Sequence, residues 1–171
     1  DARTEGIGSA ASLRRAGGAI VAPVVKADAY GTGMAAAARA LAGIGADTFF
    51  VARIEEGLGL RKALPDARIF VLDGLMPGTT PAYRANNLTP VLNSLEEIAE
   101  WSAAARDAQA TLDAVIQVDT GMNRSGLSQD DTNILAAEIN KRLNGIKLAL
   151  VLGHLACSDD PKNAINRAQL E

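Results

Sequence analysis

The chain has 171 residues, of which 48% are hydrophobic and 22% are charged, so it can bury one sizeable core and requires no second domain. Lys and Arg number 17 against 20 Asp and Glu, which gives a formal charge of -3. This balance predicts no general attraction to nucleic acid or to an anionic membrane. A small-molecule substrate is favoured instead.

The single cysteine, Cys157, cannot form an internal disulfide, as is usual for proteins of the reducing cytosol. No apolar run approaches the roughly 20 residues of a membrane-spanning helix, and the N-terminus has no basic region followed by an apolar signal core. We therefore expect a soluble, cytoplasmic protein with no membrane partner.

Short apolar runs rich in Val, Ile and Leu alternate along the chain with longer Ala-rich segments of helical periodicity. Runs with polar residues on neither face are typical of parallel strands that are buried on both sides. Six strands are predicted, at residues 19–25, 48–52, 68–72, 88–92, 112–118 and 146–152.

Helix-start signals precede two of the intervening segments. Ser94 followed by Glu97 forms a capping-box pattern, and Ser128 with Asp131 is a second helix cap. Residues 1–18 fit a leading helix only loosely. The helix after Ser128 is expected to bury an apolar face made of Ile134, Leu135, Ile139 and Leu143.

The repeated order of strand and helix predicts right-handed crossovers and a parallel sheet. Both an open doubly wound sheet and a closed eight-stranded barrel fit this order. Six strands would complete an open sheet and would leave a barrel two strands short, so the pattern by itself slightly favours the open form. No glycine-rich phosphate loop follows any strand. The unusual polar residues lie just after the carboxyl ends of the strands.

Lys26 is the first of these polar residues and directly follows the first apolar run. A lysine at the end of a buried strand is partly desolvated, which favours the neutral, nucleophilic amine of Schiff-base chemistry. The ordinary alternative is a lysine that extends from a strand end into solvent, and spacing alone favours that alternative.

The whole segment 24–33 changes that balance, because it reads Val-Val-Lys-Ala-Asp-Ala-Tyr-Gly-Thr-Gly. It closely resembles the cofactor-lysine motif of alanine racemases, in which the lysine binds pyridoxal phosphate at the end of the first barrel strand. The resemblance implies that Tyr30 hydrogen-bonds the cofactor phosphate. Small residues also leave room for a planar ring and permit tight backbone turns. They are Ala27, Ala29, Gly31 and Gly33.

A second polar segment, 118–126, follows the fifth run and reads Val-Asp-Thr-Gly-Met-Asn-Arg-Ser-Gly. By itself it is a strand that leaves the core and turns on two glycines, with Arg124 as a solvated loop charge. It resembles the Asp-Thr-Gly-Met-x-Arg-x-Gly motif of the same family, whose arginine donates to the phenolic oxygen of the cofactor and lies beside the substrate carboxylate. A planar, permanently charged guanidinium suits that role, which the resemblance assigns to Arg124.

A third segment, 153–159, follows the sixth run and contains the only histidine, His154. A solitary histidine is ordinarily a satisfied core or surface residue, and a metal site is disfavoured because no second His and no spaced Cys lie nearby. The sequence His-Leu-Ala followed by small polar and acidic residues resembles the family segment whose histidine packs near the pyridine ring. That histidine orients an arginine that would lie beyond Glu171.

Three motifs in the right order identify residues 19–171 as similar to the N-terminal, pyridoxal phosphate-binding domain of alanine racemases. The resemblance implies a (β/α)8 TIM-like barrel, here incomplete with about six of eight strands over 1–171, and without the C-terminal β domain. It implies an enzyme that interconverts L- and D-alanine for cell-wall precursors, with Lys26 as the base on the D-face. The family's shared active sites imply a homodimer.

Two departures from the family pattern carry further expectations. Many members have a carbamylated lysine seven residues before the motif arginine, and this chain has Gln117. We expect either the glutamine amide oxygen to accept from Arg124 or a bound anion such as chloride to take its place. The chain also lacks the later domain that supplies a tyrosine as the base on the opposite face, so the 171-residue chain is expected to be nearly inactive alone.

Two other functions stay open from the sequence. A pyridoxal phosphate carrier without catalysis is one, although the lysine motif of such small barrels lacks the Tyr30 segment. A structural or regulatory barrel fragment without cofactor is the other. Borohydride reduction after incubation with pyridoxal phosphate would separate these alternatives by showing whether Lys26 is modified.

Overall fold

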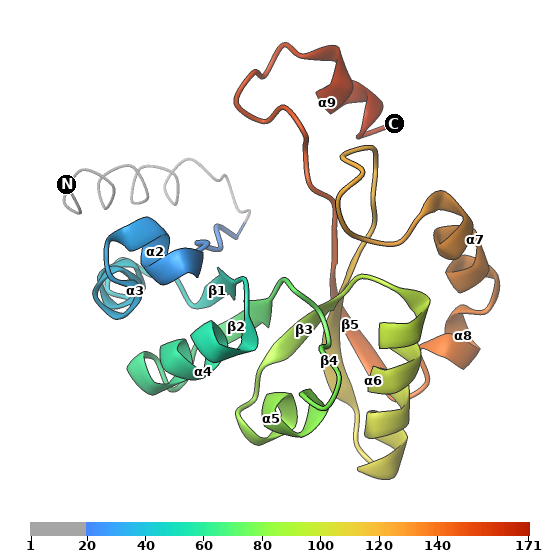
Figure 1. Ribbon diagram of the computed structural model, residues 1–171, viewed down its shortest axis with the longest axis horizontal. Helices are drawn as coiled ribbons and strands as arrows, with labels where there is room; N and C mark the ends of the chain where they lie inside the picture. The colour runs from blue at the N-terminus through green and yellow to red at the C-terminus, as the bar shows by residue number, and fades with distance from the viewer. Residues whose placement is uncertain (1–19) are drawn as a thin grey trace. The chain divides into compact units, whose positions relative to one another are not determined.

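The computed structural model describes residues 20–171 and divides into two compact units, the first ending at Pro90 and the second running from Val91 to Glu171 (Figure 1). Strand β3 (Thr89–Leu92) begins in the first unit and ends in the second. All pairs between neighbouring strands are parallel, in the order β1-β2-β3-β4-β5. The predicted α/β class with a parallel sheet is therefore confirmed.

The first unit alternates helices and strands as its apolar pattern predicts. Residues of β1 pair with those of β2 from Thr48↔Arg68 to Val51↔Val71, and β2 pairs with the start of β3. The elements of this unit besides β3 are α2 (Lys26–Gly31), α3 (Met34–Ala42), β1 (Thr48–Val51), α4 (Ile54–Ala63), β2 (Arg68–Val71) and α5 (Thr80–Ala85).

The core of the first unit is built from the apolar strands and the helices that follow them. Tyr83 of α5 is 1% exposed, and its hydroxyl donates to Gly74 O at 2.6 Å, so the one polar atom of this buried ring is satisfied. Phe50 and Phe70 make a tilted ring contact with centroids 5.0 Å apart. Fully buried aliphatic residues complete this core: Val51, Leu60, Ile69 and Val71.

The second unit continues the alternation from the end of β3. Strand β4 pairs with β5 from Leu112↔Ile146 to Gln117↔Leu152, with a bulge next to Ala114. The remaining elements are α6 (Leu95–Asp107), β4 (Leu112–Gln117), α7 (Gln129–Ala137), α8 (Ile139–Arg142), β5 (Ile146–Leu152) and α9 (Ala164–Ala168).

Both predicted helix caps are confirmed in the second unit. Ser94 Oγ accepts from Glu97 N at 3.2 Å at the start of α6, and Ser128 Oγ accepts from Asp131 N at 3.1 Å at the start of α7. Helix α6 then buries Trp101, whose indole N–H donates to Asp113 O at 3.1 Å and so ties the helix to β4. Each cap satisfies a backbone donor that the first helical turn leaves unpaired.

The first predicted strand, residues 19–25, is corrected by the structure. Ala19 lies outside the described residues, and the remainder forms only a single parallel bridge, Val24↔Phe50, beside β1. Pro23 has no N–H to donate, so this segment gains only the two bonds Val25 N to Phe50 O and Phe50 N to Pro23 O. Among residues 20–171 five strands are formed where six were predicted over 19–152. The predicted leading helix over 1–18 also lies outside the described residues.

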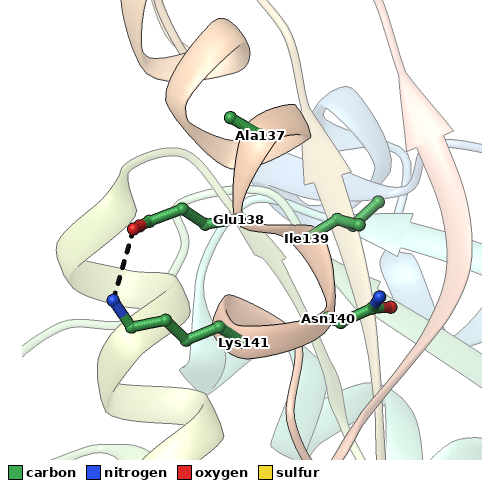
Figure 2. A pocket seen from close by; sticks show the side chains of 5 residues that line it. All are labelled: Ala137, Glu138, Ile139, Asn140 and Lys141. Atoms are coloured by element: carbon green, nitrogen blue, oxygen red, sulfur yellow. Dashed lines mark hydrogen bonds and ion pairs between the residues drawn. The ribbon is translucent and has the colours of Figure 1, made fainter.

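The helix predicted after Ser128 is interrupted at Glu138, where φ is -118° and ψ is 23°. Ile134 and Ile139 are 42% and 46% exposed, so of the predicted apolar face only Leu135 is buried. Figure 2 shows the break, where Glu138 Oε1 accepts from Lys141 Nζ at 3.2 Å beside a shallow surface pocket. The periodicity of the sequence continues through Glu138, but the backbone there is not helical and the Glu138 side chain binds Lys141 in the next turn.

Over residues 20–171 no helix combines the length and the apolar character that crossing a membrane requires.

Candidate functional site

Lys26 lies at the carboxyl end of the segment that pairs with β1. Val25 N donates to Phe50 O at 2.9 Å, and Val25 itself is 2% exposed, so the backbone leading to the lysine is buried and hydrogen-bonded. The Lys26 side chain is half-buried. Within the described part of the chain its ammonium group has neither a hydrogen bond nor an ion pair. The amine is therefore open to reaction with a ligand.

A left-handed turn follows Lys26 directly. Residues Ala27–Tyr30 have φ values of 50°, 53°, 53° and 57°, although none of them is glycine. Left-handed backbone costs residues with a Cβ atom roughly 1–2 kcal/mol each, so local bonds must hold the turn. Thr32 Oγ1 donates to Ala29 O at 2.6 Å, and Met34 N donates to Asp28 Oδ1 at 2.7 Å. This turn presents Tyr30 with a side chain that is 66% exposed.

Glu56 of α4 is a residue that the sequence reasoning missed. Its Oε1 accepts from Ala27 N at 2.7 Å, and its Oε2 accepts from Ala52 N at 2.8 Å and Arg53 N at 3.1 Å. One carboxylate thus joins the residue after Lys26 to the end of β1. The spacing of Glu56 to Arg53 signals only a helix start, because the contact with Ala27 spans 29 positions of sequence.

Arg124 lies in the loop between β4 and α7, and an aspartate shapes that loop. Asp119 Oδ1 accepts from Gly121 N at 2.9 Å and from Asn123 N at 3.0 Å, which holds the turn just before Arg124. The Arg124 side chain is exposed and, among residues 20–171, has no hydrogen bond or ion pair. A guanidinium in this state can donate to an anionic ligand.

Acid is expected to loosen the Arg124 loop through Asp119. The N–H donors of Gly121 and Asn123 hold the pKa of Asp119 below its ordinary value of 3.8. Because the pKa of Asp119 is lowered in the folded state, its carboxylate stabilises the loop fully at pH values above 3.8. This stabilisation is lost as the pH falls below 3.8 and through the folded pKa. Acid titration followed by NMR should show the Gly121 and Asn123 amides shifting together in this range.

Asp119→Asn is the control for that titration, since its amide oxygen can still accept both bonds but has no carboxyl group to protonate. The amides of Gly121 and Asn123 should then stay constant through the same acid range. Equal acid shifts in both proteins would show that another group governs the loop.

Gln117 is the last residue of β4, and one of its two expectations is wrong: among residues 20–171 its amide oxygen accepts no hydrogen bond from Arg124. Its Nε2 donates to Ser125 O at 3.2 Å and to Ser125 Oγ at 2.9 Å, and the side chain is 5% exposed. The amide therefore binds the neighbour of Arg124 in the loop. The expectation of a bound anion beside Arg124 stays a prediction.

His154 lies in the loop after β5, and a buried glutamine ties this loop to the loop after β4. Gln169 Nε2 donates to His154 O at 3.0 Å and to Thr120 Oγ1 at 3.2 Å, while its Oε1 accepts from Ala156 N at 2.8 Å. Gln169 is 7% exposed. No signal in the sequence singles out this glutamine, because its partners lie 13 to 49 positions away.

The four expected site residues are divided between the units. Lys26 and Tyr30 belong to the first, and Arg124 and His154 belong to the second. Lys26 and Tyr30 follow the segment that bridges to β1, and Arg124 and His154 follow the carboxyl ends of β4 and β5, where α/β folds place their chemistry. In the described part of the chain no group of three or more His, Cys, Asp or Glu side chains could hold a metal ion.

Comparison with known proteins gives one consistent family. The family model described as "Alanine racemase, N-terminal domain" matches residues 10–171. The catabolic alanine racemase of Agrobacterium fabrum is 52% identical over 150 residues, which cover 87% of this chain and 38% of that protein. An alanine racemase of a Methylobacterium species is 47% identical over 165 residues, covering 94% of this chain and 45% of that protein. The chain thus spans less than half the length of these curated relatives.

Solved structures agree. An alanine racemase from Bartonella henselae with covalently bound pyridoxal phosphate superposes with a TM-score of 0.94 and 32% identity, covering 99% of this chain and 49% of that one. An alanine racemase from a D-cycloserine-producing Streptomyces lavendulae gives a TM-score of 0.88 and 30% identity, covering 99% and 45%.

Proposed function

Since the chain belongs to the alanine racemase family, we propose that it forms the cofactor-binding part of an enzyme that interconverts L- and D-alanine. The cofactor is pyridoxal 5′-phosphate, the group bound covalently in the Bartonella relative. Lys26 carries the proposal, because it is half-buried, directly follows the segment that bridges to β1, and has an amine without a partner among residues 20–171.

The residues of the first unit fit a phosphorylated aldehyde with a planar ring. The Lys26 amine is available for condensation, and the exposed Tyr30 hydroxyl can donate to a phosphate. At Gly31 and Gly33 the backbone has φ values of 85° and 95°, and a Cβ atom at either residue would meet no atom of residues 20–171 within 4 Å. The space beside the turn is therefore open to a ring.

Each side chain has a distinct task in the proposed reaction. Lys26 holds the cofactor and takes or returns the α-proton of alanine on one face. Arg124 donates to the phenolic oxygen and favours the substrate carboxylate, and His154 packs near the pyridine ring. When bound, the cofactor supplies an electron sink for the α-carbon. Inversion also requires a base on the opposite face, which the family draws from its later domain.

The architecture and setting of the whole protein follow as further parts of the proposal. We expect residues 1–171 to form part of a (β/α)8 barrel domain that works in a cytoplasmic homodimer and supplies D-alanine to peptidoglycan synthesis. The support is the family match and the 99% coverage of this chain by the Bartonella structure.

Reductive trapping tests the proposal directly. The 171-residue chain is incubated with pyridoxal phosphate, reduced with borohydride and mapped by peptide mass. The pyridoxyl group is expected on Lys26, and the four other lysines, Lys62, Lys141, Lys147 and Lys162, serve as internal controls. Modification elsewhere, or none, would contradict the assignment.

Proton exchange tests whether Lys26 acts on only one face of the α-carbon of alanine. In deuterated water the loaded chain is expected to exchange the α-proton of D-alanine while forming little L-alanine, since Lys26 serves one face only. Full racemisation by this chain would show that the second base is not required from outside it.

A further inference from the structure

Two glutamates occupy the same position at the start of two helices. Glu56 in α4 accepts from Ala52 N at 2.8 Å, and Glu97 in α6 accepts from Asn93 N at 2.8 Å, each donor lying four residues earlier. Both contacts satisfy a backbone donor beside the first helical turn. Glu56 and Glu97 therefore have the same capping role at the start of their own helices.

Glu56 also makes a contact that this role does not require. Its second oxygen accepts from Ala27 N at 2.7 Å, across 29 positions of sequence. A charge-assisted bond of this kind is stronger than a bond between neutral groups. It fixes the peptide that joins Lys26 to Ala27, and this peptide opens the left-handed turn.

The left-handed turn makes this fixed peptide important for Lys26. Four consecutive residues, Ala27–Tyr30, are held in a conformation that alanine, aspartate and tyrosine disfavour. Without the anchor at its first N–H, the turn can relax toward right-handed backbone. Such a change would redirect the Cα–Cβ bond of Lys26 and displace Tyr30.

We propose that Glu56 is a positioning residue for Lys26, acting through the Ala27 N–H to aim the amine and the turn that carries Tyr30. The inference rests on the proposed role of Lys26 in binding pyridoxal phosphate. Glu56 itself touches neither cofactor nor substrate in this scheme. Its effect is to keep the reactive amine in one orientation before the ligand arrives.

Matched variants separate positioning from helix capping. Glu56→Gln keeps the shape of the side chain but leaves one acceptor oxygen, which cannot serve both Ala27 and the start of α4. Glu56→Ala removes both. Glu97→Gln and Glu97→Ala make the same changes at α6. The four variants and wild type are compared as full chains, at a temperature where circular dichroism shows each to be folded.

Two readouts are taken. The first is amide hydrogen exchange of peptides covering residues 26–33 in the absence of cofactor. The second is the concentration of pyridoxal phosphate that gives half-maximal trapping on Lys26, referred to Lys62 in the same sample. Both Glu56 variants should speed exchange in 26–33 and weaken trapping by about tenfold, the loss expected for one charge-assisted bond, while the Glu97 variants change trapping less than about twofold.

Each outcome is decisive. Unchanged exchange and trapping in the Glu56 variants, or equal changes in the Glu97 variants, would overturn the inference. Should Glu56→Ala fail to fold, Glu56→Gln gives both readouts. If wild type takes no cofactor on Lys26, the proposed function fails, whereas the exchange comparison still decides whether Glu56 holds the turn.

Discussion

Replacing Gly126 by alanine is expected to lower the free energy of unfolding by about 3 kcal/mol or more. Gly126 has φ +106°, and a Cβ atom there would lie 2.8 Å from Asp119 N, 2.9 Å from Val118 C and 3.0 Å from Gln117 O. All three atoms belong to the backbone, so no side chain can rotate away. Here the chain returns to β4 after the Arg124 loop, through Leu127 N donating to Gln117 O at 2.8 Å.

Gly153→Ala is the matched control, at the loop after β5. Its Cβ atom would meet Thr120 Cγ2 and Oγ1 at 3.7 Å, which is ordinary van der Waals contact. This change should leave stability within about 0.5 kcal/mol of wild type. Urea unfolding of the three proteins measures the difference. If both variants unfold at the same urea concentration, the close approach at Gly126 is not what holds the loop.

Local signals predicted the starts of α6 and α7 and most of the strands. Ser94 and Ser128 each cap a helix because the hydroxyl and the donor that it binds lie three residues apart, a distance that the sequence states directly. The apolar runs at 48–52 and 146–152 form β1 and β5. A continuous run of apolar residues is also a local signal, which can be read directly from neighbouring positions of the sequence.

Burial was predicted less well than strand formation. The run at 146–152 has an apolar pattern typical of a strand covered on both faces, yet Leu148 and Leu150 are each 39% exposed and Val151 is 57% exposed. An apolar pattern shows that a strand can be covered, but the covering depends on elements elsewhere in the fold. The same holds for Ile134 and Ile139 on the interrupted helix.

The backbone after Lys26 shows why the site was only partly predictable. The motif was expected to permit tight turns at its small residues, Ala27, Ala29, Gly31 and Gly33, and both glycines have the positive φ that glycine readily accepts. It did not predict that Ala27 and its three successors are also left-handed, since their own preferences oppose it. Glu56 contributes to overcoming these backbone preferences, and it is distant from Ala27 in the sequence. Of the two alternatives for Gln117, the bond from Arg124 to its amide oxygen is not formed, and its Nε2 donates to Ser125 Oγ, a contact that the sequence did not indicate.

Replacing Gln169 by leucine is expected to cost about 2–3 kcal/mol, because the change preserves volume but leaves three partners without their bonds. Ala156 N, His154 O and Thr120 Oγ1 all bond to this one amide, and Gln169 is 7% exposed, so water cannot readily replace it. The segments that precede Arg124 and contain His154 should loosen together. Amide exchange of residues 119–126 and 153–157 measures this.

Asn166→Leu isolates the link between the two loops. Asn166 is also buried, at 9% exposure, and its Nδ2 donates to Cys157 O and Asp160 O at 2.9 Å each, in the loop after β5 that contains His154. No bond of Asn166 reaches Thr120 within the described residues. Both variants should lose stability, but only Gln169→Leu should speed exchange in 119–126. Faster exchange there in both would mean that α9 supports the Arg124 loop as a whole rather than through the Gln169 amide.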